Sequence, residues 1–556
     1  GAVPLRPGLE RAAEEDIIRR YREHGYPLAD AKIRWIYRHP VTGVEHRVPI
    51  AKALGDTGMC AAARGQAMAE VETEISVYEG REGTFGETTL RGNFKTRDWV
   101  LRREVKYSAG EPYASDKVAR SEDGMDGTGV AASVELEGQP VGCELDSSAE
   151  SCVVHQIVDM REAKDISMDL SGGVGAATLD PFYVFLSPSF PNLFGTAWDL
   201  NLHGHYGFDL SEITTGALQS DCARQDCYER SARADLVRGR WLGSPLTLKI
   251  AGQAQQRATP ARGNVFSVLG TLGFSWKISS RWQVYLGYLI QRANISKDVV
   301  KPTTALETTV INRRDAVVSD RTGGLQTGVT FTNIEDNPFN PDKGFIASAE
   351  ALFASPVFGG LDWWLRTEFS WSHFIPIPRT ANRVDFRYTL SYGHTIALPG
   401  LPLANTTSVP EVWRYFGGGT VDRGMRGIRP EEMLIDIEAI EQTGDTQRLR
   451  YTAVGGQIRA LGTLALGFVS VPDLFGGKLG HSLFYDLGIM AQRWRWVQLP
   501  RDLRHSVGVN AIKWNIRLVT IALGYAILVP NAIAPGNVRP TDPRYGRVVF
   551  DVGVTF

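Results

Sequence analysis

The chain has 556 residues, 43% of them hydrophobic, and a formal net charge of only -2. With a net charge so close to zero, the chain has neither the excess of basic residues that nucleic-acid binding requires nor a strongly acidic surface, so no DNA or RNA partner is expected. The longest nearly uninterrupted apolar stretch, 518–529, is shorter than the roughly 18 residues that cross a membrane as a helix. If this protein enters a membrane, we expect it to do so as a barrel.

Residues 1–163 carry helical as well as strand periods. Apolar residues recur every four positions over 9–21 and predict an amphipathic helix that ends at His24-Gly25, while alternation over 71–77 predicts a half-buried strand. The later elements are a strand at 84–90, a helix capped by Thr96, a second helix near 115–126, and strands near 130–136 and 152–160. This order predicts two small α+β modules, in 1–80 and 81–163.

Four of the five cysteines fall into two close pairs. In an oxidising compartment Cys143 would bond to Cys152 and Cys222 to Cys227, although other connectivities remain open. Neither pair has the two-residue spacing of a zinc site, and no histidines cluster beside them, so no metal or other cofactor is expected. Cys60 is left over and is most simply a small buried hydrophobe.

From Lys164 onward the apolar period changes to two. The segments 246–250 and 384–392 alternate most cleanly, so that one face meets lipid and the other a wet lumen. The predicted strands cover 164–173, 179–189, 196–207, 226–240, 244–257, 263–277, 280–294, 323–334, 343–354, 362–375, 381–395, 453–469, 481–492, 505–513, 515–527 and 546–556. About sixteen antiparallel strands predict a transmembrane β-barrel over 164–556. A soluble all-β protein of several sandwiches is the alternative.

The lengths of the connections favour the barrel. If the first strand runs outward, connections after odd strands lie outside, and those after even strands lie inside, where turns should be short. The long connections are then all outside, at 208–225, 295–322, 396–452 and 528–544, whereas the turns at Ser279 and Trp514 are tight. A set of soluble sandwiches would not require long loops on one side only.

The chain ends inside a predicted strand. Residues 545–556 alternate apolar with variable side chains, so Phe550 and Phe556 share one face. Such a strand is expected to close the barrel. Together with Gly553, the two aromatic residues form a Phe-x-x-Gly-x-x-Phe pattern.

A turn and a long loop precede this last strand. The segment Asp336 to Gly344 has turn chemistry, because Pro341 fixes φ and Gly344 permits a positive φ. The loop 396–452 contains the glycine-rich sequence Arg-Tyr-Phe-Gly-Gly-Gly-Thr-Val-Asp-Arg-Gly-Met-Arg-Gly-Ile, which begins at Arg414. An Arg-Gly repeat in such a loop could simply be solvated.

These motifs together resemble those of the BamA/TamA superfamily of outer-membrane assembly factors. Residues 21–29 resemble the second helix of a POTRA domain and its Gly-Tyr exit, and 90–96 with 109–113 resemble the opening of the next POTRA repeat. The first module starts partway through this pattern. We therefore expect a precursor that carries at least the missing strand and helix.

The resemblance assigns a role to each barrel motif. It makes Asp336, Pro341 and Gly344 a periplasmic turn, and Phe550, Gly553 and Phe556 the signal by which a barrel is recognised and inserted. The long loop would fold back into the lumen, where an arginine meets an acid on the barrel wall.

Two Arg-Gly pairs compete for this latch. Arg423-Gly424 has the family's spacing from the preceding glycines, whereas Arg426-Gly427 has the better apolar flanks. The resemblance implies Asp486 as the acceptor, because Phe484-Tyr-Asp-Leu-Gly488 matches the family's Phe-x-Asp-x-Gly strand; a guanidinium in a partly dehydrated pore also requires a carboxylate fork. A second family acid, expected near Ala465 or Leu466, is absent, so the latch is expected to rest on one carboxylate.

The resemblance implies an outer-membrane protein that assists the insertion or translocation of other proteins. Its POTRA modules would lie in the periplasm and receive unfolded clients on their strand edges. A seam between the first and last strands would open laterally, loosened by Gly172, Gly173 and Gly175 and by the Gly553 region. Expected partners are these clients, outer-membrane lipids and accessory subunits that span the periplasm or are lipoproteins. No nucleophile, base and metal constellation is visible, which argues against an enzyme.

Two other functions remain open. A two-partner-secretion transporter would export one dedicated substrate through a related barrel. A passive channel is less favoured, since a porin does not require POTRA modules or an Arg-Gly latch.

Overall fold

The computed structural model describes residues 9–38, 45–48, 71–145, 149, 151–163, 168–177, 182–208, 228–259, 263–296, 308–309, 317–334, 343–380, 383–398, 409–417, 424–428, 433, 435–443, 446–453, 455–475, 477–492, 502–515, 519–529 and 546–555. The chain divides into two compact units. The first contains Gly1–Ser167, Asn192–Trp198 and Leu242–Ser244, and the second contains Met168–Pro191, Asp199–Trp241 and Pro245–Phe556. Within the described residues, no helix combines the length and apolar character needed to span a membrane.

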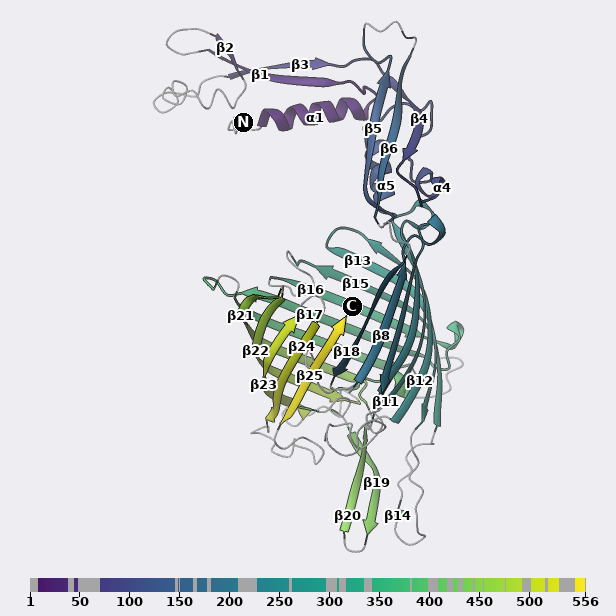
Figure 1. Ribbon diagram of the computed structural model, residues 1–556, viewed down its shortest axis with the longest axis vertical. Helices are drawn as coiled ribbons and strands as arrows, with labels where there is room; N and C mark the ends of the chain where they lie inside the picture. The colour runs from purple at the N-terminus through teal and green to yellow at the C-terminus, as the bar shows by residue number, and fades with distance from the viewer. Residues whose placement is uncertain are drawn as a thin grey trace. The chain divides into compact units, whose positions relative to one another are not determined.

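The first unit opens with one helix and a small sheet (Figure 1). Helix α1 (Leu9–Glu23) contacts β1 (Asp30–Arg38), the central strand of the sheet β2-β1-β3. The other two strands are β2 (Glu45–Val48) and β3 (Val71–Tyr78). Strand β1 was not among the predicted elements, although Ala31 and Ile33 alternate on its buried face.

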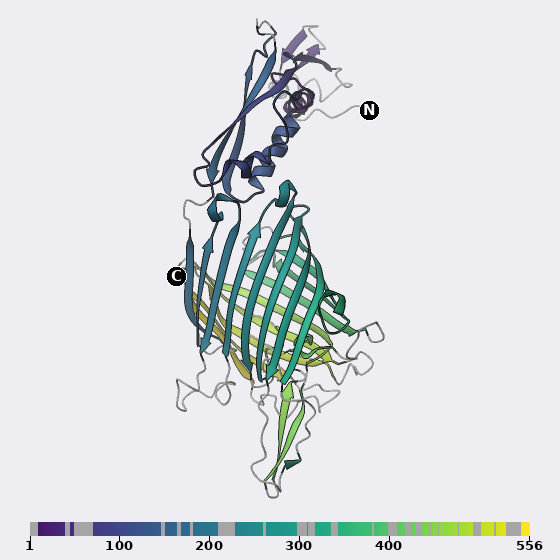
Figure 2. The same ribbon diagram turned by 90° about the vertical axis from the view of Figure 1, so that its right-hand side faces the viewer.

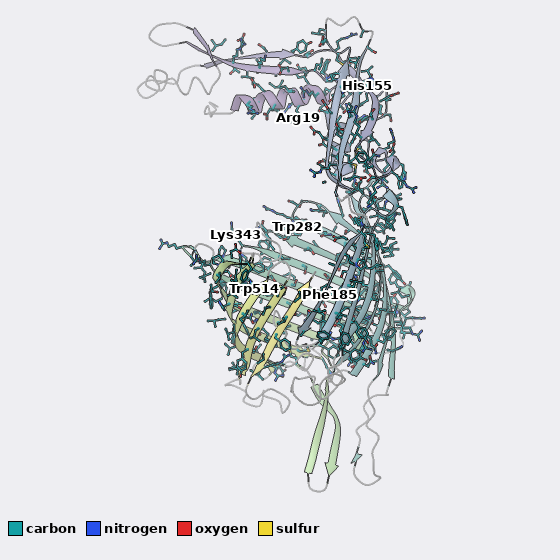
Figure 3. All side chains as sticks on the ribbon, in the orientation of Figure 1. Arg19, His155, Phe185, Trp282, Lys343 and Trp514 are labelled. Atoms are coloured by element: carbon teal, nitrogen blue, oxygen red, sulfur yellow. A yellow bond between two sulfur atoms is a disulfide. The ribbon has the colours of Figure 1, made fainter. Side chains whose placement is uncertain are left out.

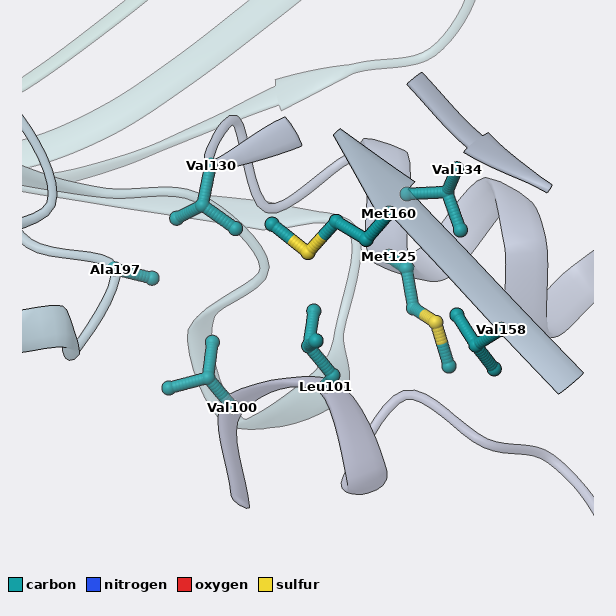
Figure 4. Close-up of a cluster of buried hydrophobic side chains, with 8 residues drawn as sticks. All are labelled: Val100, Leu101, Met125, Val130, Val134, Val158, Met160 and Ala197. Carbon is teal, nitrogen blue, oxygen red and sulfur yellow. The ribbon is translucent and has the colours of Figure 1, made fainter. Parts of the chain in front are cut away.

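The second module has two short helices and three strands. These elements are β4 (Gly83–Arg91), α4 (Asp98–Arg102), α5 (Ser115–Asp126), β5 (Ala131–Val141) and β6 (Cys152–Glu162). The sheet order is β4-β6-β5, with β4 parallel and β5 antiparallel to β6. The apolar faces of both helices and the sheet meet in one core, shown in Figure 4, which comprises Val100, Leu101, Met125, Val130, Val134, Val158, Met160 and Ala197.

The predicted cap of α4 is wrong. The N-cap residue is Arg97, and it makes no side-chain capping bond. Thr96 instead donates its hydroxyl to Glu162 Oε1 at 2.7 Å, and the Thr96 backbone N–H donates to the same oxygen at 2.6 Å. The end of β6 supplies this carboxylate, which no local pattern around Thr96 could reveal.

A disulfide joins Cys143 to Cys152 and closes the connection between β5 and β6. Both cysteines are buried with Val154, and Leu28 and Tyr113 pack against them. Cys60, Cys222 and Cys227 lie outside the described residues.

The second unit is a closed barrel of sixteen antiparallel strands, which confirms the predicted fold class (Figures 1 and 2). In chain order these are β7 (Asp169–Ala177), β8 (Phe182–Phe190), β9 (Asp199–Phe208), β10 (Tyr228–Arg238), β11 (Leu246–Thr259), β12 (Gly263–Lys277), β13 (Trp282–Ser296), β15 (Val317–Thr332), β16 (Gly344–Ala354), β17 (Trp364–Pro376), β18 (Val384–Ala397), β21 (Ile458–Leu474), β22 (Gly477–Ala491), β23 (Arg504–Asn515), β24 (Val519–Val529) and β25 (Arg547–Thr555). Strand β25 pairs with β7 and closes the barrel.

Some strand boundaries differ from the prediction. Strand β7 begins at Asp169 rather than at 164, and β15 begins at Val317 rather than at 323. Three further strands, β14 (Thr308–Thr309), β19 (Ile435–Thr443) and β20 (Thr446–Ala453), form a separate sheet within two of the long connections. This sheet was not predicted; it consists of the local hairpin β19–β20 and of β14, which pairs with β19 from far away in the chain.

The two faces of the barrel wall differ in chemistry. On one face of β25, Val548, Val552 and Val554 remain exposed, as expected for side chains that a bilayer covers. On the opposite face of β10, Arg233 and Asp235 form an ion pair at 2.6 Å. The alternation of these faces along each strand makes the lumen polar.

Aromatic side chains on the outer face gather where the short turns lie. Ring centroids are 4.7 Å apart between Trp282 and Phe331, 5.1 Å between Phe331 and Phe345, and 4.7 Å between Phe345 and Trp371. This chain of contacts crosses the four strands β13, β15, β16 and β17, and Trp282 is labelled in Figure 3. Amphipathic rings at this level are typical of the girdle that a barrel places at the edge of a bilayer.

Candidate functional site

The long connection between β18 and β21 places part of its chain against the lumen side of the barrel wall. Besides β19 and β20, its described parts include 409–417, 424–428 and Met433, which make these contacts. Tyr415 pairs with Gly456 through two backbone hydrogen bonds of 2.7 Å, just before β21 begins. This loop and the barrel wall that it contacts form the candidate site.

The Arg426 guanidinium binds the Asp486 carboxylate on β22 through both oxygens. Nη2 donates to Oδ1 at 2.6 Å and Nε donates to Oδ2 at 2.9 Å, while the Arg426 backbone N–H donates to Oδ2 at 3.1 Å. Both side chains are buried, with exposed fractions of 3% and 1%. Because a buried charge is costly without its partner, removing either side chain should strongly destabilise the packing of the loop against the wall.

Neighbouring strands complete the environment of Asp486. Thr463 on β21 donates its hydroxyl to Oδ1 at 2.9 Å, and Ser506 on β23 donates to Oδ2 at 3.2 Å. The Phe484 ring lies beneath the guanidinium, with its centroid 3.2 Å from Arg426 Cζ. The wall beside the carboxylate therefore supplies hydroxyl donors, and Thr463 stands opposite Asp486 in the register of β21 and β22.

Of the two candidate Arg-Gly pairs, the structure brings Arg426-Gly427 to the acceptor. Arg423 lies outside the described residues, and Gly424 has a φ of +88°. Gly427 sits against the wall so closely that a Cβ there would lie 2.7 Å from Ser506 Cβ and 3.0 Å from Leu528 N. A residue larger than glycine at 427 would push the arginine away from Asp486.

Apolar contacts and a further arginine hold the same segment. Met425 and Ile428 are fully buried in a cluster with Tyr415, Met433, Met490 and Leu528. Arg547, at the start of the last strand, donates from Nη1 to the Ile428 carbonyl at 2.8 Å. The loop is thus bonded to β25 as well as to β22.

Tyr415 is a second anchor of the loop. Its ring centroid lies 4.6 Å from Arg366 Cζ and 4.8 Å from Arg459 Cζ, within the range of cation–π attraction. Its hydroxyl donates to the Thr367 carbonyl at 3.1 Å, and burial raises the pKa of this hydroxyl, which keeps it a donor. The ring fits over Gly393, where a Cβ would lie 2.5 Å from it.

The seam between β25 and β7 contains a glycine pair. Among the described residues its register joins five residue pairs, from Asp551 with Ala177 to Thr555 with Gly173, and 178–181, which follow β7, lie outside the described residues. Gly553 stands opposite Gly175 in this register, so one of the five pairs consists of two glycines. Gly173 of the predicted glycine cluster also lies in the seam.

The other predicted site residues are scattered. Asp336, Pro341 and Phe556 lie outside the described residues. Gly344 has a φ of +108° at the start of β16, where a Cβ would lie 2.0 Å from the Asn333 carbonyl oxygen. Phe550 stands opposite Leu523 of β24, on the face that carries the exposed valines.

The described residues hold no group of three or more His, Cys, Asp or Glu side chains that could bind a metal ion. The two histidines of β9 make local contacts instead. His203 Nδ1 lies 2.7 Å from the Ser187 hydroxyl, and the His205 ring stacks on Tyr183 with centroids 5.0 Å apart.

Reasoning from sequence missed several residues of the site. Tyr415 lies within the motif that pointed to the loop, so the motif could have indicated it. Thr463, Ser506 and Arg547 carry no such signal, because only the register of the strands brings them to the loop.

The protein-family comparison matches residues 192–556 to the Omp85 superfamily domain. Among curated proteins, the outer membrane protein assembly factor BamA of Neisseria meningitidis serogroup B is 29% identical over 126 residues. This alignment covers 23% of the chain and only 15% of the relative's length.

Solved structures share the fold at low sequence identity. BamA from Haemophilus ducreyi lacking POTRA domains 1–3 has a TM-score of 0.67 and 16% identity, with 100% of this chain and 95% of that chain covered. CdiB from Acinetobacter baumannii has a TM-score of 0.50 and 10% identity over 98% of this chain and 81% of that chain. CdiB from Escherichia coli has a TM-score of 0.50 and 13% identity over 99% and 85%. The family model covers well over half of the chain, which therefore belongs to the Omp85 superfamily, that of the BamA/TamA outer-membrane β-barrel proteins.

Proposed function

We propose that this chain assists the insertion of other proteins into the outer membrane through the seam between β7 and β25. The observation that carries the proposal is the glycine pair of this seam, Gly175 opposite Gly553, in a register that joins five pairs among the described residues. Two opposed glycines add no side-chain contact of their own to the ladder, so this pairing separates at a lower free-energy cost than a pairing of larger residues. An opened seam presents two strand edges on which an incoming strand can pair.

Clients would first bind the modules of the first unit, which we place in the periplasm. Strand β5 lies at the edge of the sheet β4-β6-β5, and β3 lies at the edge of β2-β1-β3. An extended polypeptide can add to such an edge through main-chain hydrogen bonds, with little demand on its sequence. This work requires no catalytic group, and we propose a non-enzymatic role.

The loop latch, defined as Arg426 bound to Asp486, would hold the C-terminal side of the barrel together while the seam opens. Its contacts reach β22 through Asp486, β23 through Ser506 and β25 through Arg547. These strands are joined by the loop as well as by their ladders. Opening is therefore expected at β25–β7 rather than between two of the last strands.

The test is a reversible lock across the seam. Val174 and Val554 stand opposite each other in the register of β7 and β25, and the paired variants Val174→Cys and Val554→Cys would join the two strands under oxidation. We expect the oxidised protein to lose insertion of a β-barrel client into lipid vesicles, and a dithiol reductant to restore it.

A matched lock controls for the effect of a cross-link as such. Ile521 of β24 stands opposite Val552 of β25, so Ile521→Cys with Val552→Cys joins strands that stay together in either state. This second lock should leave insertion unchanged. Equal insertion with and without the seam lock would refute the proposal.

A secretion transporter is the second candidate, because the fold is also similar to CdiB at a TM-score of 0.50. Export through the lumen does not require the seam to separate. Under that function, the locked protein would still carry a soluble substrate across the vesicle membrane. Ion conductance with neither activity would instead favour a passive channel.

A further inference from the structure

The glycine pair in the seam has a tyrosine above it. Gly175 of β7 and Gly553 of β25 stand opposite each other, and Tyr183 of β8 is the register partner of Gly175. A Cβ on Gly175 would lie 2.5 Å from both Cζ and Oη of Tyr183, and a Cβ on Gly553 would lie 3.2 Å from the same hydroxyl oxygen. The side chain therefore reaches from β8 across β7 to β25.

This tyrosine lies on the lumen face. Val174, Val552 and Val554 alternate with the glycine pair and remain exposed on the outer face. Behind Tyr183, the ring of His205 on β9 stacks at a centroid distance of 5.0 Å. The arrangement thus spans four consecutive strands, β9, β8, β7 and β25.

A second ring repeats the pattern within the first hairpin of the barrel. Phe185, labelled in Figure 3, lies over Gly173, where a Cβ would be 2.7 Å from Phe185 Cε1. An aromatic ring over a strand glycine covers backbone that would otherwise face water, and so stabilises the pairing of that strand. Among these two rings, Tyr183 is the one placed over the β25 residue Gly553.

We propose that Tyr183 is a positioning residue that holds the seam closed from the lumen side. The inference rests on the proposed function, because it specifies what opposes opening of the seam. Glycine at 175 and 553 leaves room for the Tyr183 ring. The glycine pair therefore helps to keep the seam between β7 and β25 closed, because it admits this ring, and does not merely weaken the ladder. His205 supports the ring from the side away from the seam.

The barrel offers a matched control with the same chemistry. Tyr285 of β13 lies over Gly328 of β15, and its hydroxyl is 3.1 Å from Gln326 Nε2. This ring also covers a lumen-facing glycine of the next strand, but that wall has fifteen register pairs and lies far along the sheet order from the seam.

The experiment measures opening directly, by hydrogen–deuterium exchange of the full chain in lipid nanodiscs without clients. Exchange of paired amides reports the population of the open state. A ring contact of this kind is worth a factor of about two to ten in that population. Tyr183→Leu should therefore accelerate exchange in 169–177 and 547–555 by about that factor, whereas Tyr285→Leu should accelerate it only in β13 and β15.

A rescue keeps the test independent of folding yield. Gly553→Ala should accelerate exchange at the seam, because its methyl group meets the Tyr183 hydroxyl, and adding Tyr183→Phe should return exchange toward the original rate. Seam exchange that is unchanged in Tyr183→Leu, or a Gly553→Ala effect that Tyr183→Phe does not reduce, would overturn the inference even if the seam lock blocks insertion. Faster seam exchange, combined with insertion that the lock does not affect, would uphold the inference and overturn the proposed function.

Discussion

The seam between β25 and β7 and the wall formed by β21, β22 and β23 belong to one continuous sheet, yet they are stabilised in different ways. The wall has long ladders, a buried ion pair and a loop bound across it. Among the described residues the seam joins five pairs, and one of these consists of two glycines. Side-chain contacts thus reinforce the wall, whereas at the seam the Tyr183 ring lies over a glycine pair.

Under the proposed function, this difference would give the closed barrel one preferred place to open. Backbone hydrogen bonds alone make every pair of neighbouring strands alike, so strand length and cross-strand side chains must break that equivalence. The loop adds contacts to several strands of the wall at once. Substitutions at Arg426 or Asp486 should therefore lower the unfolding free energy of the barrel by more than the loss of one contact between two strands would.

Asp486→Ala should have the largest effect, because it leaves the Arg426 guanidinium buried without its carboxylate. We expect the barrel to lose about 3–5 kcal/mol of unfolding free energy. The measurement is urea unfolding in detergent micelles, followed by tryptophan fluorescence. Asp385→Ala is the matched control, since Asp385 pairs with Arg387 of its own strand and does not hold the loop. Equal losses of unfolding free energy in the two variants would show that the latch stabilises the wall no more than an ion pair within one strand stabilises the barrel.

Arg426→Lys should have an intermediate effect. The ammonium keeps the charge but cannot donate to both oxygens of Asp486 as the guanidinium does, so about 1.5–3 kcal/mol should be lost. Release of the loop can be followed by hydrogen–deuterium exchange of the backbone amides of 424–428. Exchange as slow as in the unchanged chain would indicate that charge alone, and not the fork, holds the loop.

Thr463→Val should have the smallest effect. It removes one hydroxyl donor, 2.9 Å from Asp486 Oδ1, and should lower the unfolding free energy of the barrel by about 1 kcal/mol. Thr389→Val is the control, because the Thr389 hydroxyl is exposed and contacts only the Ser372 hydroxyl among its described partners. If Thr389→Val lowered the unfolding free energy more than Thr463→Val in the same urea experiment, the Thr463 hydroxyl would not contribute to the latch.

The sequence was sufficient for the class of fold and for the number of strands. Period-two alternation is a local property, because successive side chains point to opposite faces whatever the neighbours are. The family resemblance identified Asp486 and the Arg-Gly segment as candidates for one contact. Local reasoning failed for the cap of α4, since Glu162 reaches Thr96 from the end of a distant strand.

By itself, then, the sequence determined that this chain forms a barrel of about sixteen strands, and the family resemblance of its motifs narrowed the latch to two Arg-Gly pairs. Only the tertiary structure decided that Arg426 binds Asp486, that Thr463 and Ser506 donate to the same carboxylate, and that Tyr183 lies over a glycine pair. These facts depend on register, and register is a relation between strands that are not adjacent in sequence. Local patterns specify which face a residue occupies, whereas the closed sheet specifies which residues meet there.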